Sequence, residues 1–287
     1  MITGGRNLGI LRRKLRSLWL SPKRIWWKIC YIFDNDNFCE SECNICGARS
    51  TVAIKVLGER EARSCMNCGS SVRFRSVVAA LLGIIGENRK SLKSIRARKS
   101  LRVLGCSDTR IYAEVLEEKF DYLNTFYHTT PLLDLTNPSE EFIASADILV
   151  CSDVLEHVPP PVEIAVQGCF DVLRPGGSLV VSVPYTWDGS TVEHFPSLHR
   201  YEVVRRGDKH ILHNTTVDGA SEVFHDLVFH GGPGSTLEMR VFSFSDLRDL
   251  LTAVGFEVDD AATRRINESF TSASNNIAYP VVARKPR

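Results

Sequence analysis

An apolar run at residues 148–151 predicts a buried strand near the middle of the chain. A helical pattern follows over residues 159–173, and it opens with three prolines, which the first turn of a helix tolerates. A Pro-Gly-Gly turn ends this helix, and the apolar residues 178–183 predict a second strand. Such a crossover joins parallel strands, and open parallel sheets bind ligands beyond the carboxyl ends of their strands. We therefore expect the polar residues directly after residue 151 to lie at a ligand site.

The same periodicities predict further elements of an α/β fold on both sides of this unit. Upstream, we expect in chain order a helix, a strand, a helix and a strand at residues 77–85, 101–104, 112–120 and 122–127. Downstream, we expect a helix capped by Gly255 and then two strands, at residues 246–253, 256–258 and 277–283. Strands that alternate with helices favour a mostly parallel sheet that is covered by helices.

One combination of motifs in the central unit is specific. Residues 147–161 read DILVCSDVLEHVPPP, and residues 172–184 read VLRPGGSLVVSVP. Together they closely resemble motifs of class I S-adenosylmethionine-dependent methyltransferases of the type 11 kind, and the resemblance covers roughly residues 100–285. It implies a Rossmann-like α/β sheet of seven strands with an antiparallel pair at one edge, and methyl transfer from S-adenosylmethionine. A generic parallel α/β domain with a Pro-Gly-Gly turn is the alternative.

The resemblance assigns the turn after the strand at 101–104 to a loop that passes beneath the cofactor. Gly105 matches the first glycine of that loop and Cys106 follows it, whereas Ser107 and Thr109 stand where glycines are more usual. Glycine lets the backbone come close to a ligand. We expect Gly105, Cys106 and Ser107 to bind the cofactor despite the altered pattern.

The resemblance also implies contacts to the rest of the cofactor. The family commonly holds the ribose hydroxyls with a carboxylate at the end of the second strand, and this chain has none there. We expect Asn124 to substitute, with Thr125 or a residue from elsewhere as the alternatives. Asp134 and Leu135 fit the loop that meets the adenine amino group, a donor that would otherwise be buried without a partner. The remaining cofactor-binding residues, beside the amino-acid end or the methyl-transfer zone, are Ser152, Asp153 and Val154.

Two matching Cys-x-x-Cys-Gly sequences precede this domain. Cys43 and Cys46 form the first pair and Cys65 and Cys68 the second, with 18 residues between the pairs. The two-residue spacer lets both thiolates of a pair bind one metal, and four thiolates suit a tetrahedral, structural Zn²⁺ site. The pattern resembles a zinc ribbon. The arginines that follow it could bind nucleic acid or pack the ribbon against the catalytic domain.

Residues 1–38 form a basic leader with interleaved tryptophans. Eight Lys and Arg residues precede the first acidic residue, Asp34. Cations attract anionic head groups and indoles favour the membrane boundary, so one hypothesis is peripheral contact with an anionic inner membrane. The alternatives are an extension whose tryptophans dock on the body of the protein, and contact with RNA phosphates.

A polar insert at about residues 185–238 interrupts the predicted sheet. Six of the eight histidines lie between residues 194 and 230. We interpret the insert as a lid or an acceptor-binding element. His194, His230 and the earlier His157 are the candidate catalytic bases; metal binding is the weaker interpretation, because the histidines have no recognisable ligand spacing. Glu156 and His157 are further candidates for shaping the substrate mouth.

Composition narrows the class of protein. A chain of 287 residues with 44% hydrophobic and 24% charged residues has room for one large and one smaller domain. A net charge of +1 does not argue for nucleic acid, and nine cysteines are too few for a disulfide scaffold. There is neither an apolar run of membrane-spanning length nor a secretory signal, so we expect a cytoplasmic protein.

These features predict a leader at 1–38, a zinc ribbon at 39–72 and a methyltransferase domain at 73–287. The layout and the Glu-His-Phe-Pro and Phe-His-Gly-Gly segments look similar to bacterial methyltransferases of polysaccharide or sugar biosynthesis. We therefore predict O-methylation of a sugar or glycan acceptor. The alternatives are a zinc-ribbon RNA methyltransferase, and a binding protein that has lost activity, which Val103 and the missing ribose carboxylate favour.

Overall fold

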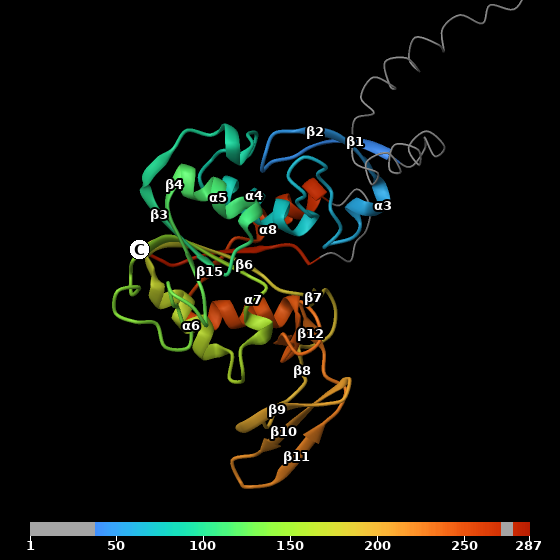
Figure 1. Ribbon diagram of the computed structural model, residues 1–287. Helices are drawn as coiled ribbons and strands as arrows, with labels where there is room; N and C mark the ends of the chain where they lie inside the picture. The colour runs from blue at the N-terminus through green and yellow to red at the C-terminus, as the bar shows by residue number, and fades with distance from the viewer. Residues whose placement is uncertain (1–37, 271–277) are drawn as a thin grey trace, which may run out of the picture.

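A mixed sheet of six strands forms the centre of the molecule (Figure 1). The computed structural model describes residues 38–270 and 278–287. The strands lie side by side in the order β15-β16-β6-β5-β3-β4. Their bounds are β3 (Arg98–Cys106), β4 (Phe120–Thr125), β5 (Ala146–Ser152), β6 (Leu173–Ser182), β15 (Glu257–Val258) and β16 (Val281–Arg284).

The direction of the strands agrees with the sequence, and their number differs. β3 to β6 run parallel, whereas β16 is antiparallel to β6 and β15 is antiparallel to β16. The antiparallel pair at one edge is therefore confirmed. Within the described residues the sheet has six strands where we expected seven. Residues 126–145 between β4 and β5 form turns and one isolated bridge, Phe126 to Leu132, because they contain no apolar run of strand length.

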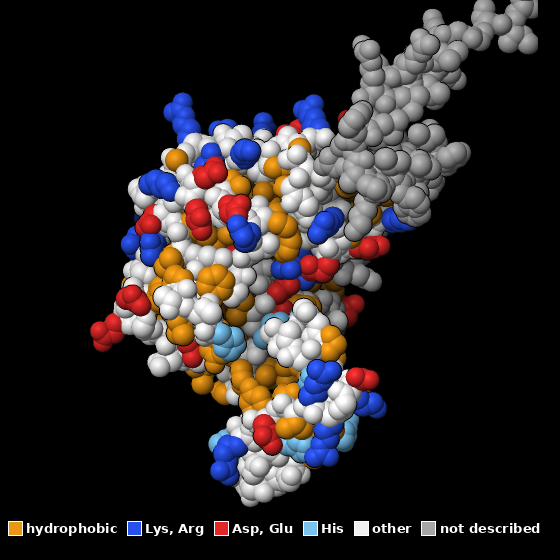
Figure 2. Space-filling model, in the orientation of Figure 1, with side chains coloured by type: hydrophobic (Ala, Val, Ile, Leu, Met, Phe, Trp, Pro, Cys, Tyr) orange, Lys and Arg blue, Asp and Glu red, His pale blue; other side chains and the backbone are white. Residues whose placement is uncertain are grey.

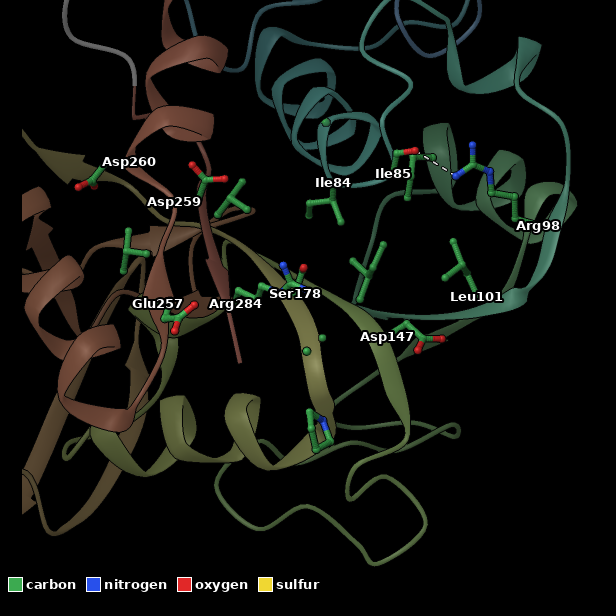
Figure 3. Close-up of a pocket in the computed structure, with 17 residues that line it drawn as sticks. Ile84, Ile85, Arg98, Leu101, Asp147, Ser178, Glu257, Asp259, Asp260 and Arg284 are labelled. Atoms are coloured by element: carbon green, nitrogen blue, oxygen red, sulfur yellow. Dashed lines mark hydrogen bonds between the residues drawn. The ribbon is translucent and has the colours of Figure 1, made fainter. Parts of the chain in front are cut away.

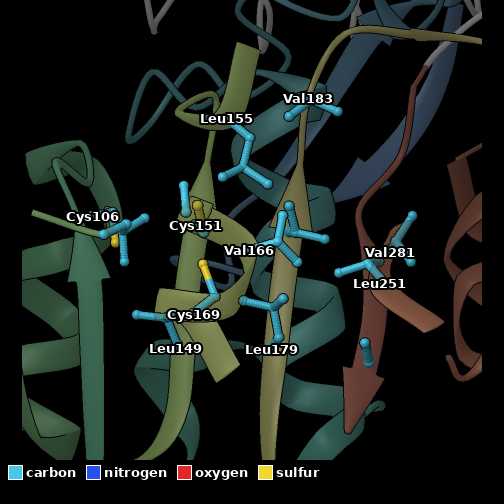
Figure 4. Close-up of a cluster of buried hydrophobic side chains, with 14 of the residues drawn as sticks. Cys106, Leu149, Cys151, Leu155, Val166, Cys169, Leu179, Val183, Leu251 and Val281 are labelled. Atoms are coloured by element: carbon cyan, nitrogen blue, oxygen red, sulfur yellow. The ribbon is translucent and has the colours of Figure 1, made fainter. Parts of the chain in front are cut away.

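Helices cover both faces of the sheet. One face carries α4 (Val72–Ile84), α5 (Arg110–Lys119) and α8 (Asp260–Phe270), and the other carries α6 (Glu163–Val172) and α7 (Phe244–Val254) (Figure 1). Successive side chains of β5 enter the two cores in turn: Ile148 and Val150 pack towards the first set of helices, Leu149 and Cys151 towards the second (Figure 4). A strand that is buried on both faces reads as a continuous apolar run, and this explains why β5 was visible in the sequence.

The Pro-Gly-Gly turn lies inside β6 rather than before it. The preceding helix α6 ends at Val172, and β6 begins at Leu173. Gly176 has φ +79°, and a Cβ added to Gly177 would lie 2.9 Å from the carbonyl oxygen of Arg174. The pairing of β5 with β6 shifts register at this point. Pro175, Gly176 and Gly177 thus form an irregularity in the first part of the strand, and positions 176 and 177 of this irregularity fit only glycine.

The N-terminal module shares its core with the body. β1 (Phe38–Glu42) and β2 (Arg49–Ala53) form an antiparallel hairpin, followed by the short α3 (Ile54–Leu57). The short helix η2 (Leu92–Ser94) donates backbone hydrogen bonds to the cysteine loop, from Leu92 N to Asn44 O at 2.7 Å. Apolar side chains of the module belong to one buried cluster with α4 and the sheet. The predicted module is therefore attached through a continuous core. The predicted leader, with its proposed membrane contact, lies outside the described residues.

The insert folds as small sheets that project from the body (Figure 1). The outer sheet contains β9 (Arg200–Arg206), β10 (Lys209–Thr215) and β11 (Ser221–Phe224). The inner part contains β7 (Tyr185–Thr186), β8 (Val192–Glu193), β12 (Phe229–His230), β13 (Thr236–Leu237) and β14 (Arg240–Ser243). β14 leads into α7, which ends at Gly255 with φ +111°, as expected for a C-cap. Among the described residues, no helix is both long and apolar enough to cross a bilayer.

Candidate active site and zinc centre

The four predicted zinc cysteines come together in the N-terminal module. The Sγ atoms of Cys43 and Cys68 are 3.7 Å apart, as are those of Cys46 and Cys65, and one ligand atom from each of the four lies within 4.8 Å of the others. A tetrahedral zinc with Zn–S bonds of about 2.3 Å requires sulfur atoms about 3.8 Å apart. The cysteine positions therefore fit a tetrathiolate zinc ion.

Local backbone geometry explains the repeated Cys-x-x-Cys-Gly sequence. Gly47 and Gly69 have φ of +76° and +75°, a region that glycine enters without strain. Their amides donate to Cys43 O at 2.7 Å and Cys65 O at 3.0 Å. Each glycine thus closes a tight turn that turns both sulfurs of its pair towards one point.

Two arginines contact the predicted cofactor site at the boundary between the N-terminal module and the body. Arg60 donates from Nη2 to Asp153 Oδ1 at 2.5 Å and from Nη1 to Asp153 Oδ2 at 2.9 Å. Arg73 Nε lies 3.2 Å from Asp153 Oδ2, and its Nη1 donates to Ser152 Oγ at 3.3 Å. Burial opposes the charge of Asp153, but the Arg60 guanidinium outweighs it and lowers the pKa of that carboxyl. Arg60 thus joins the module to the body, and Arg73, at the start of α4, also contacts Glu61 of the module at 2.7 Å.

The glycine loop after β3 keeps the expected backbone although its residues differ from the family pattern. Ser107 stands where a glycine is usual and has φ +58°, the left-handed region that glycine favours. Its amide donates to Thr125 O at 2.7 Å, and Thr125 Oγ1 donates to Gly105 O at 2.8 Å. These bonds fix the loop at the carboxyl end of β3, next to β4.

Asn124 is engaged with this loop. Its Oδ1 accepts from Asp108 N at 2.8 Å, and its Nδ2 donates to Asp108 O at 2.9 Å. The carboxylate of Asp108 in turn accepts from Tyr112 at 2.7 Å and from Tyr122 at 2.9 Å. A Cβ on Gly105 would lie only 2.2 Å from Asp108 Oδ2, so this position needs glycine for close packing. The predicted ribose contact of Asn124 remains a prediction.

Asp108 makes folding stability depend on pH. Burial raises the pKa of its carboxyl from the ordinary 3.8 to about 6, and the two tyrosine hydroxyls only partly offset this. Because the folded state holds the proton more tightly than the unfolded state, this stability is fully present below pH 4 and is lost as the pH rises through 6. A shift of two units corresponds to about 3 kcal/mol. Between pH 4 and pH 7, we expect the free energy of unfolding of Asp108→Asn to rise by about 3 kcal/mol relative to that of the parent protein.

Urea unfolding at a series of pH values measures this difference. The exposed Glu140→Gln serves as the control, and its free energy of unfolding should run parallel to that of the parent chain. Parallel curves for Asp108→Asn as well would contradict the assigned burial of the charge.

The adenine candidates lie on the loop between β4 and β5. Asp134 is partly buried, and its Oδ1 accepts from the amide and the hydroxyl of Thr136 at 2.8 and 2.7 Å. Leu135 is buried, and its carbonyl oxygen would lie 1.8 Å from a Cβ on Gly168 of α6. The glycine therefore allows α6 to hold this loop close to the sheet. Val154 packs against the same core between Asp153 and the short helix η3 (Leu155–His157).

The three predicted histidines meet at the junction of the body and the insert. His194 Nε2 lies 2.9 Å from Glu238 Oε1, and His230 Nε2 lies 2.8 Å from Glu238 Oε2. The rings of His157 and His230 are 4.7 Å apart, edge to face. Figure 2 shows histidine side chains gathered where the projecting sheet meets the body. The buried Arg240 and a backbone hydrogen bond from Met239 N to Glu156 O at 2.7 Å hold this part of the insert against η3.

Glu156 lies beneath this histidine cluster. Its side chain is 0% exposed, and its nearest His neighbours are His157 Nε2 at 3.7 Å and His230 Nδ1 at 3.8 Å. Burial lowers the pKa of His157, which argues against an ion pair at 3.7 Å, and we regard His157 as neutral. Burial, with the charge of Asp153, raises the pKa of Glu156 well above its ordinary value.

A cavity of about 870 Å³ lies elsewhere. It opens where β3 and β5 begin and is lined by, among others, Arg98, Asp147, Ser178 and Arg284 (Figure 3). Ligands of parallel sheets bind at the opposite edge, where strands end. The predicted site residues lie at that other edge, so this cavity does not identify the cofactor site.

Comparison with known proteins bears on the segment that holds the cofactor candidates. The profile of a family described as "Methyltransferase domain" matches residues 91–181. This segment, less than half of the chain, is similar to such a domain. All nine predicted cofactor-binding residues fall inside it, whereas the zinc cysteines, His194 and His230 fall outside. No curated protein matches the sequence.

Solved structures of methyltransferases match the chain at low similarity. One is a 1,6-didemethyltoxoflavin-N1-methyltransferase from Burkholderia thailandensis, with 16% identity, 75% of this chain and 79% of that chain covered, and a TM-score of 0.42. Another is an amino pentose methyltransferase from Micromonospora echinaspora, with 14% identity, 76% and 92% covered, and a TM-score of 0.40. These values are too low to transfer an acceptor or a residue role.

The sequence indicated some residues of the site only through the motif around them, and it did not indicate Arg60. Arg60 lies in a segment without a motif and contacts a residue 93 positions away. The Phe-His-Gly-Gly segment did carry a signal for Glu238, as one of the acids near its end. Asp108 was visible only as part of the altered glycine loop. No spacing rule would have paired these residues in advance.

Proposed function

We propose that the chain transfers a methyl group from S-adenosylmethionine to a hydroxyl of a sugar or glycan. The observation that carries the methyl-transfer part is the loop 105–109, which keeps a left-handed residue at Ser107 and lies beside Asp153 at the carboxyl edge of the sheet, within the matched segment. This is the edge at which parallel α/β sheets bind nucleotides. Its place in the methyltransferase domain supports binding of this nucleoside cofactor.

The chain's own residues would hold the cofactor at three points. The backbone of the Gly105 loop would pass beneath it, and Asp134 would accept a hydrogen bond from the adenine amino group. Arg60 and Arg73, which now neutralise Asp153, are the cations nearest to this edge and would face the cofactor's carboxylate. When bound, the cofactor supplies an electrophilic methyl group. The protein's contribution is then to orient the acceptor and exclude water.

The acceptor would lie under the insert. A second cavity, of about 460 Å³, is formed by insert residues that include Asp208, His210, Asp226 and Phe229. Carboxylates and imidazoles can bond to sugar hydroxyls, while an aromatic ring suits the apolar face of a sugar ring. His194, whose Nε2 is held by Glu238, would accept the hydroxyl proton on its other ring nitrogen, and His230 would hold Glu238 in place from the opposite oxygen.

An acceptor screen tests this assignment. The purified protein is incubated with S-adenosylmethionine and with nucleotide sugars, oligosaccharides or RNA, and S-adenosylhomocysteine is measured. We expect turnover with a sugar acceptor that survives nuclease treatment. Turnover only with RNA, lost after nuclease and steeply reduced by salt, would replace the sugar proposal by the RNA alternative.

The charge distribution favours the sugar over RNA. Arg60 of the module and Arg73 and Arg75 of α4 point inward: the Arg60 and Arg73 side chains are 17% and 18% exposed, and Arg75 is 6% exposed, whereas Arg49 and Arg63 of the module are exposed. Residues 185–238 contain eight acidic and four basic side chains. Such surfaces repel a phosphate backbone rather than bind it. The inactive-protein alternative is tested by the cofactor titration described in the Discussion.

A further inference from the structure

Three side chains from two distant segments surround one point at the junction of η3 and the insert. The pair Glu156 and His157 belongs to η3, and His230 belongs to β12, 73 residues beyond His157. Glu156 Oε1 lies 3.7 Å from His157 Nε2 and 3.8 Å from His230 Nδ1. One ligand atom from each of the three residues lies within 4.8 Å of the others.

In each imidazole, the contact made by one ring nitrogen determines that the other nitrogen, which faces this point, carries no proton. His157 Nδ1 lies 2.8 Å from the carbonyl oxygen of Leu237, which can only accept, so Nδ1 carries the proton. His230 Nε2 lies 2.8 Å from Glu238 Oε2, and by the same argument Nε2 carries the proton. His157 Nε2 and His230 Nδ1 are therefore unprotonated, and their lone pairs face Glu156. Imidazoles that ligate metals are held in this way, with the other nitrogen donating to a carbonyl or carboxylate.

The carboxylate of Glu156 supplies the independent observation. Its side chain is 0% exposed, and neither oxygen has a hydrogen-bond partner in the described part of the chain. A buried carboxylate that faces lone pairs is unfavourable unless a proton or a metal cation lies between them. The side chain of His230 is 33% exposed, so the point can be reached from solvent.

We propose that Glu156, His157 and His230 bind a divalent transition-metal ion. Two imidazole nitrogens and one carboxylate oxygen suit Zn²⁺, Mn²⁺, Fe²⁺ or Co²⁺, whereas Mg²⁺ and Ca²⁺ prefer oxygen ligands alone. Bonds of about 2.0–2.2 Å place tetrahedral ligand atoms about 3.4 Å apart. The two observed distances from Glu156, 3.7 and 3.8 Å, exceed this by a few tenths of an ångström, and all three ligand atoms lie within 4.8 Å of one another.

Three protein ligands leave coordination positions open. This arrangement is typical of catalytic rather than structural metal sites. The metal site itself does not depend on methyl transfer. A further role rests on the proposed function: the ion would bind an acceptor oxygen, orient it and lower the pKa of its hydroxyl.

Metal content of the full chain tests the proposal. Purified protein is equilibrated with Zn²⁺ or Mn²⁺, passed through a desalting column and measured by elemental analysis, and binding is followed by titration calorimetry. We expect Glu156→Gln, which preserves the side-chain volume, and His230→Ala each to bind about one metal equivalent fewer than the parent chain. The result is the difference in metal content between each variant and the parent chain. Metal bound at the cysteine site is present in both and cancels.

Control and outer-contact variants sharpen the result. His199→Ala removes an exposed histidine of the same insert and should keep the parent metal content. Glu238→Ala removes the partner of His230 Nε2 and should weaken the metal affinity 10–100-fold without removing a ligand. Circular dichroism checks that each variant is folded. The proposal is overturned if Glu156→Gln is folded and binds Zn²⁺ and Mn²⁺ as the parent chain does. It is also overturned if Cys65→Ser removes all of the metal that the parent chain binds.

Discussion

Replacing Cys65 by serine is expected to abolish zinc binding at the cysteine centre and to unfold the hairpin and loops of residues 38–71. Cys65 is buried, and its Sγ lies 3.7 Å from that of Cys46. Structural zinc contributes about 10–16 kcal/mol to the folding of isolated zinc-finger peptides, so its loss exceeds what so small a module can recover. The module shares a core with α4, so the melting temperature of the whole chain should also fall.

Elemental analysis and hydrogen exchange measure this result. The variant should hold one zinc fewer, and the amides of β1 and β2 should exchange freely while those of β5 remain protected. Arg60 and Arg73 would then lose their positions against Asp153, and cofactor affinity should drop as well. Cys39→Ser is the matched control, because Cys39 lies in β1 of the module but outside the group of four. Unchanged zinc content in Cys65→Ser would refute the tetrathiolate site.

Arg240→Met is expected to cost about 3–5 kcal/mol of the free energy of unfolding. Arg240 is 0% exposed, and its Nη1 donates to the carbonyl oxygens of Leu155 and Val158, both at 2.7 Å. Its Nε lies 2.5 Å from Glu193 Oε1. Methionine keeps much of the volume but leaves two carbonyls and a carboxylate without their donor. These contacts join the insert to η3, so the substitution should destabilise the insert and also lower the stability of the whole chain.

Chemical unfolding of the parent and variant chains gives this difference directly. Arg248→Met is the control, because the Arg248 side chain is 47% exposed and its ion pairs are at the surface. Its effect should stay within about 0.5 kcal/mol. A loss for Arg240→Met no larger than that of the control would show that the buried guanidinium does not hold the insert in place.

The buried strands and the zinc cysteines were predictable because local sequence determines them. β5 and β6 are apolar on both faces, and this produces runs such as Ile148 to Cys151. The Cys-x-x-Cys-Gly repeat carries its own turn geometry in two glycines of positive φ. Both features depend on neighbours a few residues apart, and the structure agrees with them.

The candidate site was only partly predictable because long-range packing assembles it. His157, His194 and His230 were selected as single residues, yet their shared partners Glu156 and Glu238 emerge only when the insert folds back on η3. The pairing of Arg60 with Asp153 likewise joins two modules. The expectation of seven strands came from resemblance alone, and residues 126–145 lack the apolar run that an additional strand needs.

Titration of the zinc-loaded full chain with S-adenosylmethionine and S-adenosylhomocysteine tests the central claim most directly. We predict saturable binding with a dissociation constant on the order of micromolar, strongly weakened in Asp134→Ala and unchanged in the exposed Glu140→Ala. Circular dichroism of each variant shows whether it is folded. A folded parent chain that binds neither compound would contradict the methyltransferase function and favour a binding protein on this fold; its metal content would still decide the His–Glu site separately.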